Sequence, residues 1–342
     1  MRSHLRTLIV LALAAALLGL VLYNVDLRGV AREIVHARFD WLTLSLLTMF
    51  ANLAIRAWRW QYLLEPLGPT SFANAFRATA VGFAATSILP ARAGEVIRPY
   101  FLARHEHMSA TAAFATVILE RVLDMLTVLG MLAAYVFFFR PELATTNAVA
   151  FEAVKWAGGT AAVGAVVVLA VFFVLAGDPA RLGKTLFRLE QVLPSKLVGL
   201  LAGVAEKFAT GLAAVRRPGR LLVALILSVP LWLSIATGTW AASMAFHLAV
   251  PFTGSFLLVA LLVVGVAVPT PGAVGGFHAA YKFAVTTFFA APDDAAVGAA
   301  IVLHVLTIGP NLLLGLFFAA QAGLNISVMK QLADQPDPGR TV

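Results

Sequence analysis

The chain has 342 residues, of which 61% are hydrophobic and only 12% are charged, and its mean hydropathy is +0.89. Because soluble domains have about half apolar and about a quarter charged residues, this composition excludes an ordinary soluble enzyme and indicates a protein dissolved mostly in lipid. The chain lacks cysteine, which excludes disulfides and thiolate chemistry, and its formal charge of +8 indicates basic cytoplasmic loops rather than a nucleic-acid partner.

Six apolar stretches are long enough to cross a bilayer, which takes about 20 mainly apolar residues. In chain order they are Leu8–Tyr23, Trp41–Leu64, Ala110–Phe139, Ala153–Ala176, Leu221–Phe246 and Ala295–Ala322. The first follows two arginines, as the apolar core of a signal peptide does, but the many later spans favour an uncleaved first helix.

Two further apolar stretches are interrupted by proline and glycine. Phe72–Leu89 runs into the letters PARAGEVIRP, and Phe256–Val268 ends at PTPGAVGG. The sequence therefore predicts an all-α, polytopic membrane helix bundle with about six full spans and two re-entrant or broken helical segments. We expect one transmembrane domain, 1–330, followed by a polar tail, 331–342.

The longest polar stretch, 177–220, lies between the fourth and fifth spans. Its leucines recur every three or four residues among many basic residues, which is typical of an amphipathic segment on a membrane surface. The basic excess places this linker in the cytoplasm, where 181–220 would face the anionic leaflet. The amino terminus is then cytoplasmic if Phe72–Leu89 dips in and returns, and external if it crosses; the charge bias favours the first arrangement.

The two broken regions resemble each other. Phe72–Phe139 and Phe252–Ala319 each contain an apolar stretch, a Pro/Gly break, a short second segment and a long final helix. We therefore consider half-repeats 41–176 and 221–322, whose broken segments would enter from opposite sides, as in transporters with inverted repeats. Broken backbone at membrane depth needs protein or water around it, so paired breaks favour a cavity; two packing kinks are the alternative.

Three charges interrupt the apolar stretch Ala110–Phe139: Glu120, Arg121 and Asp124. They lie about 15–20 Å along the helix, where each charge costs about 2.5–3.5 kcal/mol in lipid, so we expect them to face protein. Glu120 and Asp124 share a face, and Arg121 reaches Asp124. Either a structural ion pair or a functional site accounts for them, and their net charge of −1 requires a further cation. The candidate cations are Arg77, Arg92 and Arg98.

The letters PARAGEVIRP form the most distinctive local motif. Gly94 allows a tight turn, and we expect the two prolines to end the flanking helices. Arg92 and Arg98 carry planar guanidinium groups suited to phosphate, and Glu95 holds an arginine or competes with an anion for it. A positive cytoplasmic loop with a balancing glutamate is the alternative.

Several other polar residues are secondary candidates. Arg56 and Arg59, in RAWRW, are read first as interfacial anchors, and contact with lipid phosphates is compatible with that role. A lone histidine is more often a packing residue than a ligand, and no metal-binding spacing occurs, so we expect no metal, no cofactor and no catalytic residue. The candidates near the second break are Pro271, Gly275, Gly276, His278 and His304.

The segments RAWRWQYLL, ILPARAGEVIRPYFL, ILERVLDML and PTPGAVGGF resemble the lysylphosphatidylglycerol synthase transmembrane-region family, also called flippase-like or UPF0104. That family includes the membrane half of multiple peptide resistance factors. The resemblance covers nearly the whole chain, and PxRxGE and ERxxD are its most specific parts.

The chain departs from the family pattern at two places. Larger members add a cytoplasmic aminoacyl-transferase domain, whereas this sequence continues after Ala322 only as a short polar tail, so the resemblance does not imply lipid aminoacylation. Relatives often carry an acidic residue after the later Pro/Gly break, where this chain has Phe277 and His278.

The resemblance and the buried charges together favour a flippase or transporter that moves an anionic or phosphate-bearing lipid across the bacterial inner membrane. No ATP-binding motif occurs, so movement is passive, proton-coupled or driven by a partner. The candidate headgroup residues are Arg92, Glu95, Arg98, Glu120, Arg121 and Asp124. The alternatives are an intramembrane lipid-modifying transferase and a non-catalytic accessory protein that binds envelope-biosynthesis enzymes.

Overall fold

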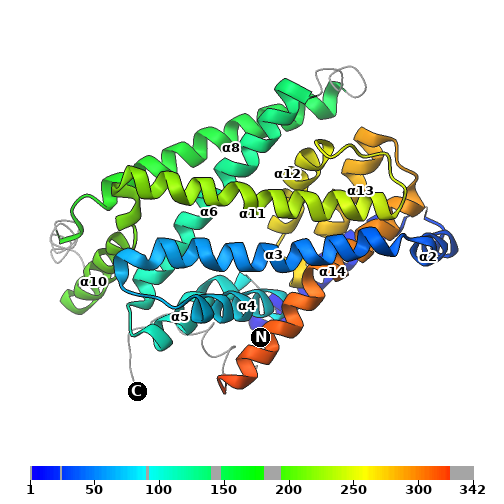
Figure 1. Cartoon of the computed structure of the whole chain (residues 1–342). Coiled ribbons are helices and arrows are strands. Elements are labelled where there is room, and N and C mark those ends of the chain that lie inside the picture. Colours follow the sequence, from blue (N-terminus) through cyan, green and yellow to red (C-terminus); the bar gives the residue numbers. More distant parts are fainter. Residues whose placement is uncertain (1, 24, 90–91, 140–147, 181–193, 324–342) are drawn as a thin grey trace.

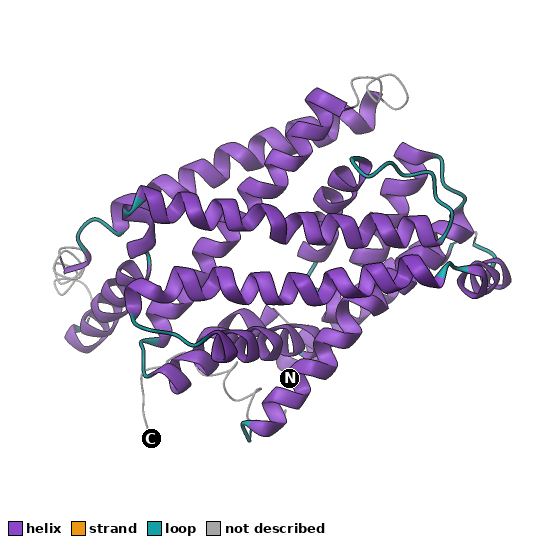
Figure 2. Ribbon diagram, viewed as in Figure 1, coloured by secondary structure: helices purple, strands orange, loops and turns teal. Residues whose placement is uncertain are grey.

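The computed structural model describes residues 2–23, 25–89, 92–139, 148–180 and 194–323. Within these ranges the chain is built from helices joined by short loops, as Figure 2 shows, and it contains no strand. The predicted all-α, polytopic membrane architecture is therefore confirmed. The expected tail, 331–342, and residues 181–193 of the amphipathic linker lie outside the described residues.

Four helices in the described part of the chain are long and apolar enough to cross a membrane. They are α3 (Phe39–Leu64), α8 (Ala148–Leu175), α11 (Pro218–Ala245) and α14 (Asp293–Gln321). A fifth span results if α1 (Arg2–Leu22) and α2 (Leu27–His36), which are bent by 82°, act together. The sixth predicted span is α6 (Ala110–Ala134), which has the length but carries three charged residues at its middle.

The two broken segments are hairpins. In the first, the start of α4 (Phe72–Ile88) lies close to the end of α5 (Gly94–Glu106), because the Ser71 backbone N–H donates to the Glu106 carboxylate at 2.9 Å. In the second, α12 (Gly254–Ala267) and α13 (Gly276–Phe289) also return, since Phe289 packs on Gly254. These helices of 13 to 17 residues span about 20–25 Å, less than the roughly 30 Å hydrocarbon core, which favours re-entrant hairpins over full crossings.

Each hairpin closes on a pair of glycines. A Cβ atom on Gly94 would collide with the carbonyl oxygen of Gly82, and one on Gly265 would collide with the carbonyl oxygen of Gly276. Both crossings thus bring backbone against backbone, which only glycine permits.

The turn of the first hairpin differs in detail from the prediction. Gly94 begins α5 instead of forming the turn, and the left-handed residue is Arg92, with φ of 54°. Pro99 lies inside α5 and does not end it, so that expectation was wrong, while Pro90 lies outside the described residues. A non-glycine residue with positive φ is uncommon, and here the Arg92 side chain reaches Val266 of the other hairpin.

Helices α3 and α11 run antiparallel through the middle of the bundle (Figure 1). Near the start of α3, the Arg38 backbone N–H donates to Ala245 O at 2.9 Å. Near its end, Tyr62 O accepts from Arg220 at 3.1 Å. Because each hairpin follows one of these two helices, the hairpins begin at opposite ends of the bundle.

The element order is the same in both parts of the chain. A long helix, a hairpin and another long helix occur as α3, α4–α5, α6 and again as α11, α12–α13, α14. The parts interlock, because α4 packs on α14 and α12 packs on α6. The hairpin tips meet where Arg92 Nη2 donates to Val266 O at 2.8 Å and where Gly272 approaches Ser87 O.

Candidate functional site

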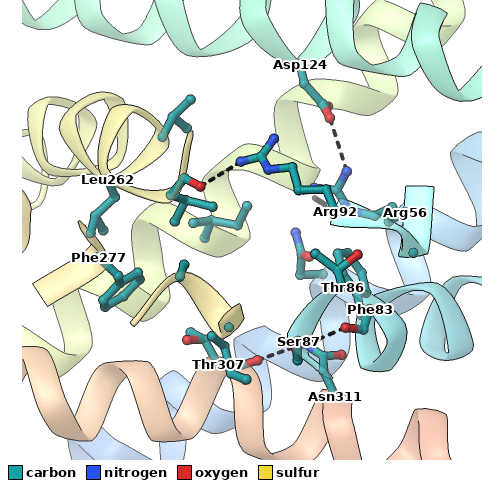
Figure 3. A pocket seen from close by; sticks show the side chains of 18 of the residues that line it. Arg56, Phe83, Thr86, Ser87, Arg92, Asp124, Leu262, Phe277, Thr307 and Asn311 are labelled. Atoms are coloured by element: carbon teal, nitrogen blue, oxygen red, sulfur yellow. Dashed lines mark hydrogen bonds and ion pairs between the residues drawn. The ribbon is translucent and has the colours of Figure 1, made fainter. Parts of the chain in front are cut away.

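A cavity of about 600 Å³ lies where the two hairpin tips meet between the long helices (Figure 3). This volume is typical of a pocket for a small ligand or a lipid headgroup. Its described lining includes six charged residues, which are Arg56, Arg92, Glu95, Arg98, Arg121 and Asp124.

Asp124 is the centre of one half of the charged network. Its carboxylate accepts from Arg56 at 3.1 Å, from Arg59 at 2.7 Å and from the Trp232 indole N–H at 3.0 Å. The three donors come from α3 and α11, so α6 is fixed to the central antiparallel pair at this point. An ion pair this enclosed needs such full hydrogen bonding to offset the loss of water.

Glu120, one turn earlier on α6, is the centre of the other half of the charged network. It is fully buried and lies between Arg59, at 3.2 Å, and Arg98, at 2.7 Å. Arg59 also donates to Ser228 Oγ on α11 at 2.6 Å. The Arg59 guanidinium therefore bridges the two carboxylates behind the cavity wall without lining the cavity itself.

Arg98 is the buried cation that faces the cavity. Its guanidinium lies 3.8 Å from the centre of the Trp60 ring, and Thr116 accepts from the Trp60 indole N–H at 2.9 Å. Only Nη1 is used, on Glu120; Nη2 is buried and has no hydrogen-bond partner among the described residues. One edge of the Arg98 guanidinium, formed by Nε and Nη2, is therefore buried without a partner among the described residues, which favours a polar group reaching it from the cavity.

A looser chain of charges lies nearer the opening. Arg121 is 3.5 Å from Asp124 and 3.7 Å from Glu95, and Glu95 is 3.8 Å from Arg92. The side chains of Arg92 and Arg121 are 41% and 36% exposed, so they keep freedom to move that Arg59 and Arg98 lack. This part of the network is suited to exchanging an internal carboxylate for an incoming anion.

The lining carries more positive than negative charge. Four arginines face the cavity against two carboxylates, an excess of two positive charges among the described lining residues. Arg59 and Glu120 behind the wall cancel each other. Because arginines outnumber carboxylates in this lining, the cavity is suited to binding an anion.

The interfacial-anchor interpretation of Arg56 and Arg59 was wrong. Their exposed fractions are 4% and 0%, and both pair with carboxylates on α6, whereas Trp58 between them is 55% exposed. Helix α11 covers their face of α3, which the order of residues near the end of an apolar run does not reveal.

Sequence reasoning also missed a polar stripe on α3. Ser45, Thr48 and Asn52 precede Arg56 at helical spacing and line the cavity with it. Across the cavity, Thr307 and Asn311 on α14 lie one turn apart and also line it. Polar residues three or four positions apart inside apolar spans were the available signal.

Apolar side chains also line the cavity. In Figure 3, Leu262 and Phe277 of the second hairpin lie across the cavity from Arg56, whereas Phe83 of the first hairpin lies beside Arg56, 5.7 Å from its guanidinium. The cavity therefore offers both arginines and apolar side chains, as a binding site for an amphiphile requires.

The candidates of the second hairpin support its tip and do not line the cavity. His304 bonds the Gly272 carbonyl oxygen at 2.8 Å and stacks on His278, with ring centres 4.6 Å apart. Gly275, with φ of 87°, lies against Leu17 of α1. Pro271 starts the short turn η6 (Pro271–Ala273), and Gly276 forms the crossing described above.

Arg77 lies apart from the charged network. Its side chain is exposed on α4, 6.0 Å from the ring of Phe318, and does not line the cavity. The charge of Glu120 is balanced instead by Arg59 and Arg98.

The fold and cavity define a class: polytopic helical membrane proteins with a polar chamber enclosed by two helical hairpins. The family model described as the lysylphosphatidylglycerol synthase TM region matches residues 7–315, so the chain belongs to that family. It is also similar to a UPF0104 membrane protein of Methanocaldococcus jannaschii, with 26% identity over 107 residues. That match covers 30% of this chain and 32% of the relative.

Proposed function

We propose that this protein moves a lipid with an anionic, phosphate-bearing headgroup across the bacterial inner membrane. The headgroup passes through the cavity while the tails stay in the bilayer. The observation that carries the proposal is the excess of two positive charges in a cavity that is also lined by apolar side chains. The family supports it as well, because its name refers to the synthesis of a phospholipid.

The roles follow from how firmly each group is held. Arg92 and Arg121, with long and partly exposed ion pairs, receive the headgroup, and Arg98 offers its free edge deeper inside. Glu120 and Asp124 hold the arginines in place. The hairpins would act as inverted halves, 41–176 and 221–322, that open in turn toward opposite sides, with the amino terminus in the cytoplasm.

Lipid exchange in vesicles tests the proposal. Purified protein is reconstituted into liposomes that contain fluorescent phosphatidic acid or, in parallel, fluorescent phosphatidylglycerol, and dithionite bleaching reports how fast the inner leaflet becomes accessible. We expect faster exchange than in empty liposomes, and about a tenfold slowing in Arg121→Ala, because one hydrogen bond to a charged group contributes about 1.5–3 kcal/mol. Arg77→Ala, which removes an arginine outside the cavity, should exchange like wild type.

Two results would contradict the proposal. One is exchange no faster than in empty liposomes, and the other is an Arg121→Ala rate equal to that of wild type. Mass spectra of the recovered lipids should be unchanged; a covalently altered lipid would favour the transferase alternative.

A further inference from the structure

The charge in the cavity specifies more than an anion. The excess is two positive charges whether only the lining is counted, or Arg59 and Glu120 behind it are included as well. Charges enclosed by protein remain costly until they are compensated. An occupant with two negative charges neutralises the site, whereas one with a single charge leaves one arginine uncompensated.

The free donors point to the same occupant. Arg98 is 4% exposed, and its buried Nη2 atom has no partner among the described residues, like the buried Nε atom of Arg56; both arginines line the cavity. Arg92 and Arg121 approach their carboxylates no closer than 3.5 Å, so a better acceptor can draw them away. A terminal phosphate offers three oxygens to these donors, and a phosphodiester offers only two unesterified ones.

We propose that the cavity selects a lipid phosphomonoester, held as its dianion by Arg98 together with Arg92 and Arg121, over lipids with a phosphodiester headgroup. This inference rests on the proposed function, since it names the substrate class of the same cavity. The apolar wall formed by residues such as Leu262 and Phe277 receives the first carbons of the lipid beside the phosphate.

The proposal predicts a specific pH dependence. A phosphomonoester loses its second proton near pH 6, so its dianion becomes about tenfold rarer with each pH unit below that value, whereas a phosphodiester stays singly charged. The charged groups that face the site are Arg56 from α3, Arg92, Glu95 and Arg98 from the first hairpin, and Arg121 and Asp124 from α6, with Arg59 and Glu120 behind them. The lining residues described on α4, α11, α12, α13 and α14 carry no charge, and His278 and His304 lie behind the second tip.

Binding to the detergent-purified chain tests the selection without requiring transport. The probes are dioctanoyl phosphatidic acid, a monoester, and dioctanoyl phosphatidylglycerol, a diester, titrated at pH 5.0 and 7.5. We expect phosphatidic acid to bind at least tenfold more tightly at pH 7.5 and to lose most of that preference at pH 5.0. Equal affinities at pH 7.5, or a preference that does not change with pH, would overturn the proposal.

A soluble probe separates the two sources of a phosphomonoester. Glycerol 3-phosphate carries the same headgroup charge without tails, and we expect it to displace phosphatidic acid only at far higher concentration. Displacement at equal concentration would show that the site takes a soluble phosphate, and it would overturn the assignment to lipid.

Charge variants make the test independent of folding, because the readout is a ratio of two affinities in one protein. Arg92→Gln lowers the excess to one positive charge and should bring the two lipids to within about twofold. Arg77→Gln is the matched control and should keep the wild-type ratio. A wild-type ratio in Arg92→Gln would overturn the charge argument.

The two proposals can fail separately. If lipid exchange occurs in vesicles but binding shows no preference for the monoester, only this inference is wrong. If binding shows the preference but no exchange occurs, only the transport proposal is wrong.

Discussion

Glu120 is the residue on which the arginine arrangement depends most. Its carboxylate is fully buried and accepts from Arg59 on one side and from Arg98 on the other. The side chain never reaches the cavity, so its contribution is to hold Arg98 with one edge directed inward. A buried carboxylate between two guanidinium groups is a positioning group. Its removal leaves Arg98 without a carboxylate and Arg59 with Asp124 as its remaining carboxylate.

We therefore expect Glu120→Gln to destabilise the protein strongly. Removing one partner of a buried ion pair costs about 3–5 kcal/mol, because the remaining charge stays enclosed. The same substitution at Glu152, whose pair with Lys155 at 2.7 Å is about half exposed, should cost less than about 1 kcal/mol. Thermal unfolding in detergent compares the two variants. Similar melting temperatures for both would contradict the buried role of Glu120.

The sequence predicted the acidic part of this network better than the basic part. Glu120 and Asp124 were recognisable because charges in the middle of an apolar helix are rare. Arg56 and Arg59 stand near the end of an apolar run beside tryptophans, which is equally typical of an interfacial anchor. Their burial depends on Trp232, Ser228 and the rest of α11, and no local pattern places that helix against α3.

At the scale of elements, the hairpins depend on close contact between backbones. In the first hairpin, a Cβ atom on Gly82 would lie 2.7 Å from the Cβ atom of Arg98, so Gly82 also sets where the cavity arginine begins. In the second, Gly265 lies against the backbone of Gly276. Each crossing must separate if a side chain is added.

We expect Gly82→Ala and Gly265→Ala each to lower the melting temperature and to slow lipid exchange. Adding bulk to a tightly packed contact costs about 1–3 kcal/mol. The control is Gly130→Ala on α6, where nothing lies within 4 Å of the added Cβ atom and alanine should stabilise the helix by about 0.5–1 kcal/mol. If all three variants melted alike, the glycine crossings would not be what closes the hairpins.

The sequence predicted the positions of both breaks, but it did not predict the backbone conformation at the first one. Proline and glycine after an apolar run mark an interruption, and this signal placed the two hairpins correctly. It did not identify Arg92 as the left-handed residue, because tertiary contact holds that conformation: the Arg92 side chain donates to Val266 in the other hairpin. Pro99 was assigned to a helix end on local preference, yet α5 continues past it between its packed neighbours α4 and α6.

At the scale of the whole molecule, the composition was enough to predict the fold class, but it could not predict where the cavity lies. A mean hydropathy of +0.89 leaves few alternatives to a membrane helix bundle. The cavity, in contrast, exists because segments about 170 residues apart, such as Arg92 and Val266, come together at the hairpin tips. Such pairing depends on how α4 packs on α14 and α12 on α6, which periodicity within one helix does not determine.

The antiparallel packing of α3 and α11 predicts that the two hairpins enter the membrane from opposite sides. The loop that starts the first hairpin follows the end of α3, beside Arg220, and the loop that starts the second follows Ala245, beside Arg38. Exposed positions in these loops are Pro69 and Ala249.

Because the chain contains no cysteine, Pro69→Cys and Ala249→Cys each introduce a single reactive thiol for an impermeant maleimide. Basic residues Arg216, Arg217 and Arg220 lie at the end of the bundle where α3 finishes, and the positive-inside rule places that end in the cytoplasm. We therefore expect Ala249→Cys to react in intact cells and Pro69→Cys to react only after permeabilisation. Labelling of both from the same side would mean that α3 and α11 do not cross as an antiparallel pair, and the cavity would lose the two-sided access on which lipid movement depends.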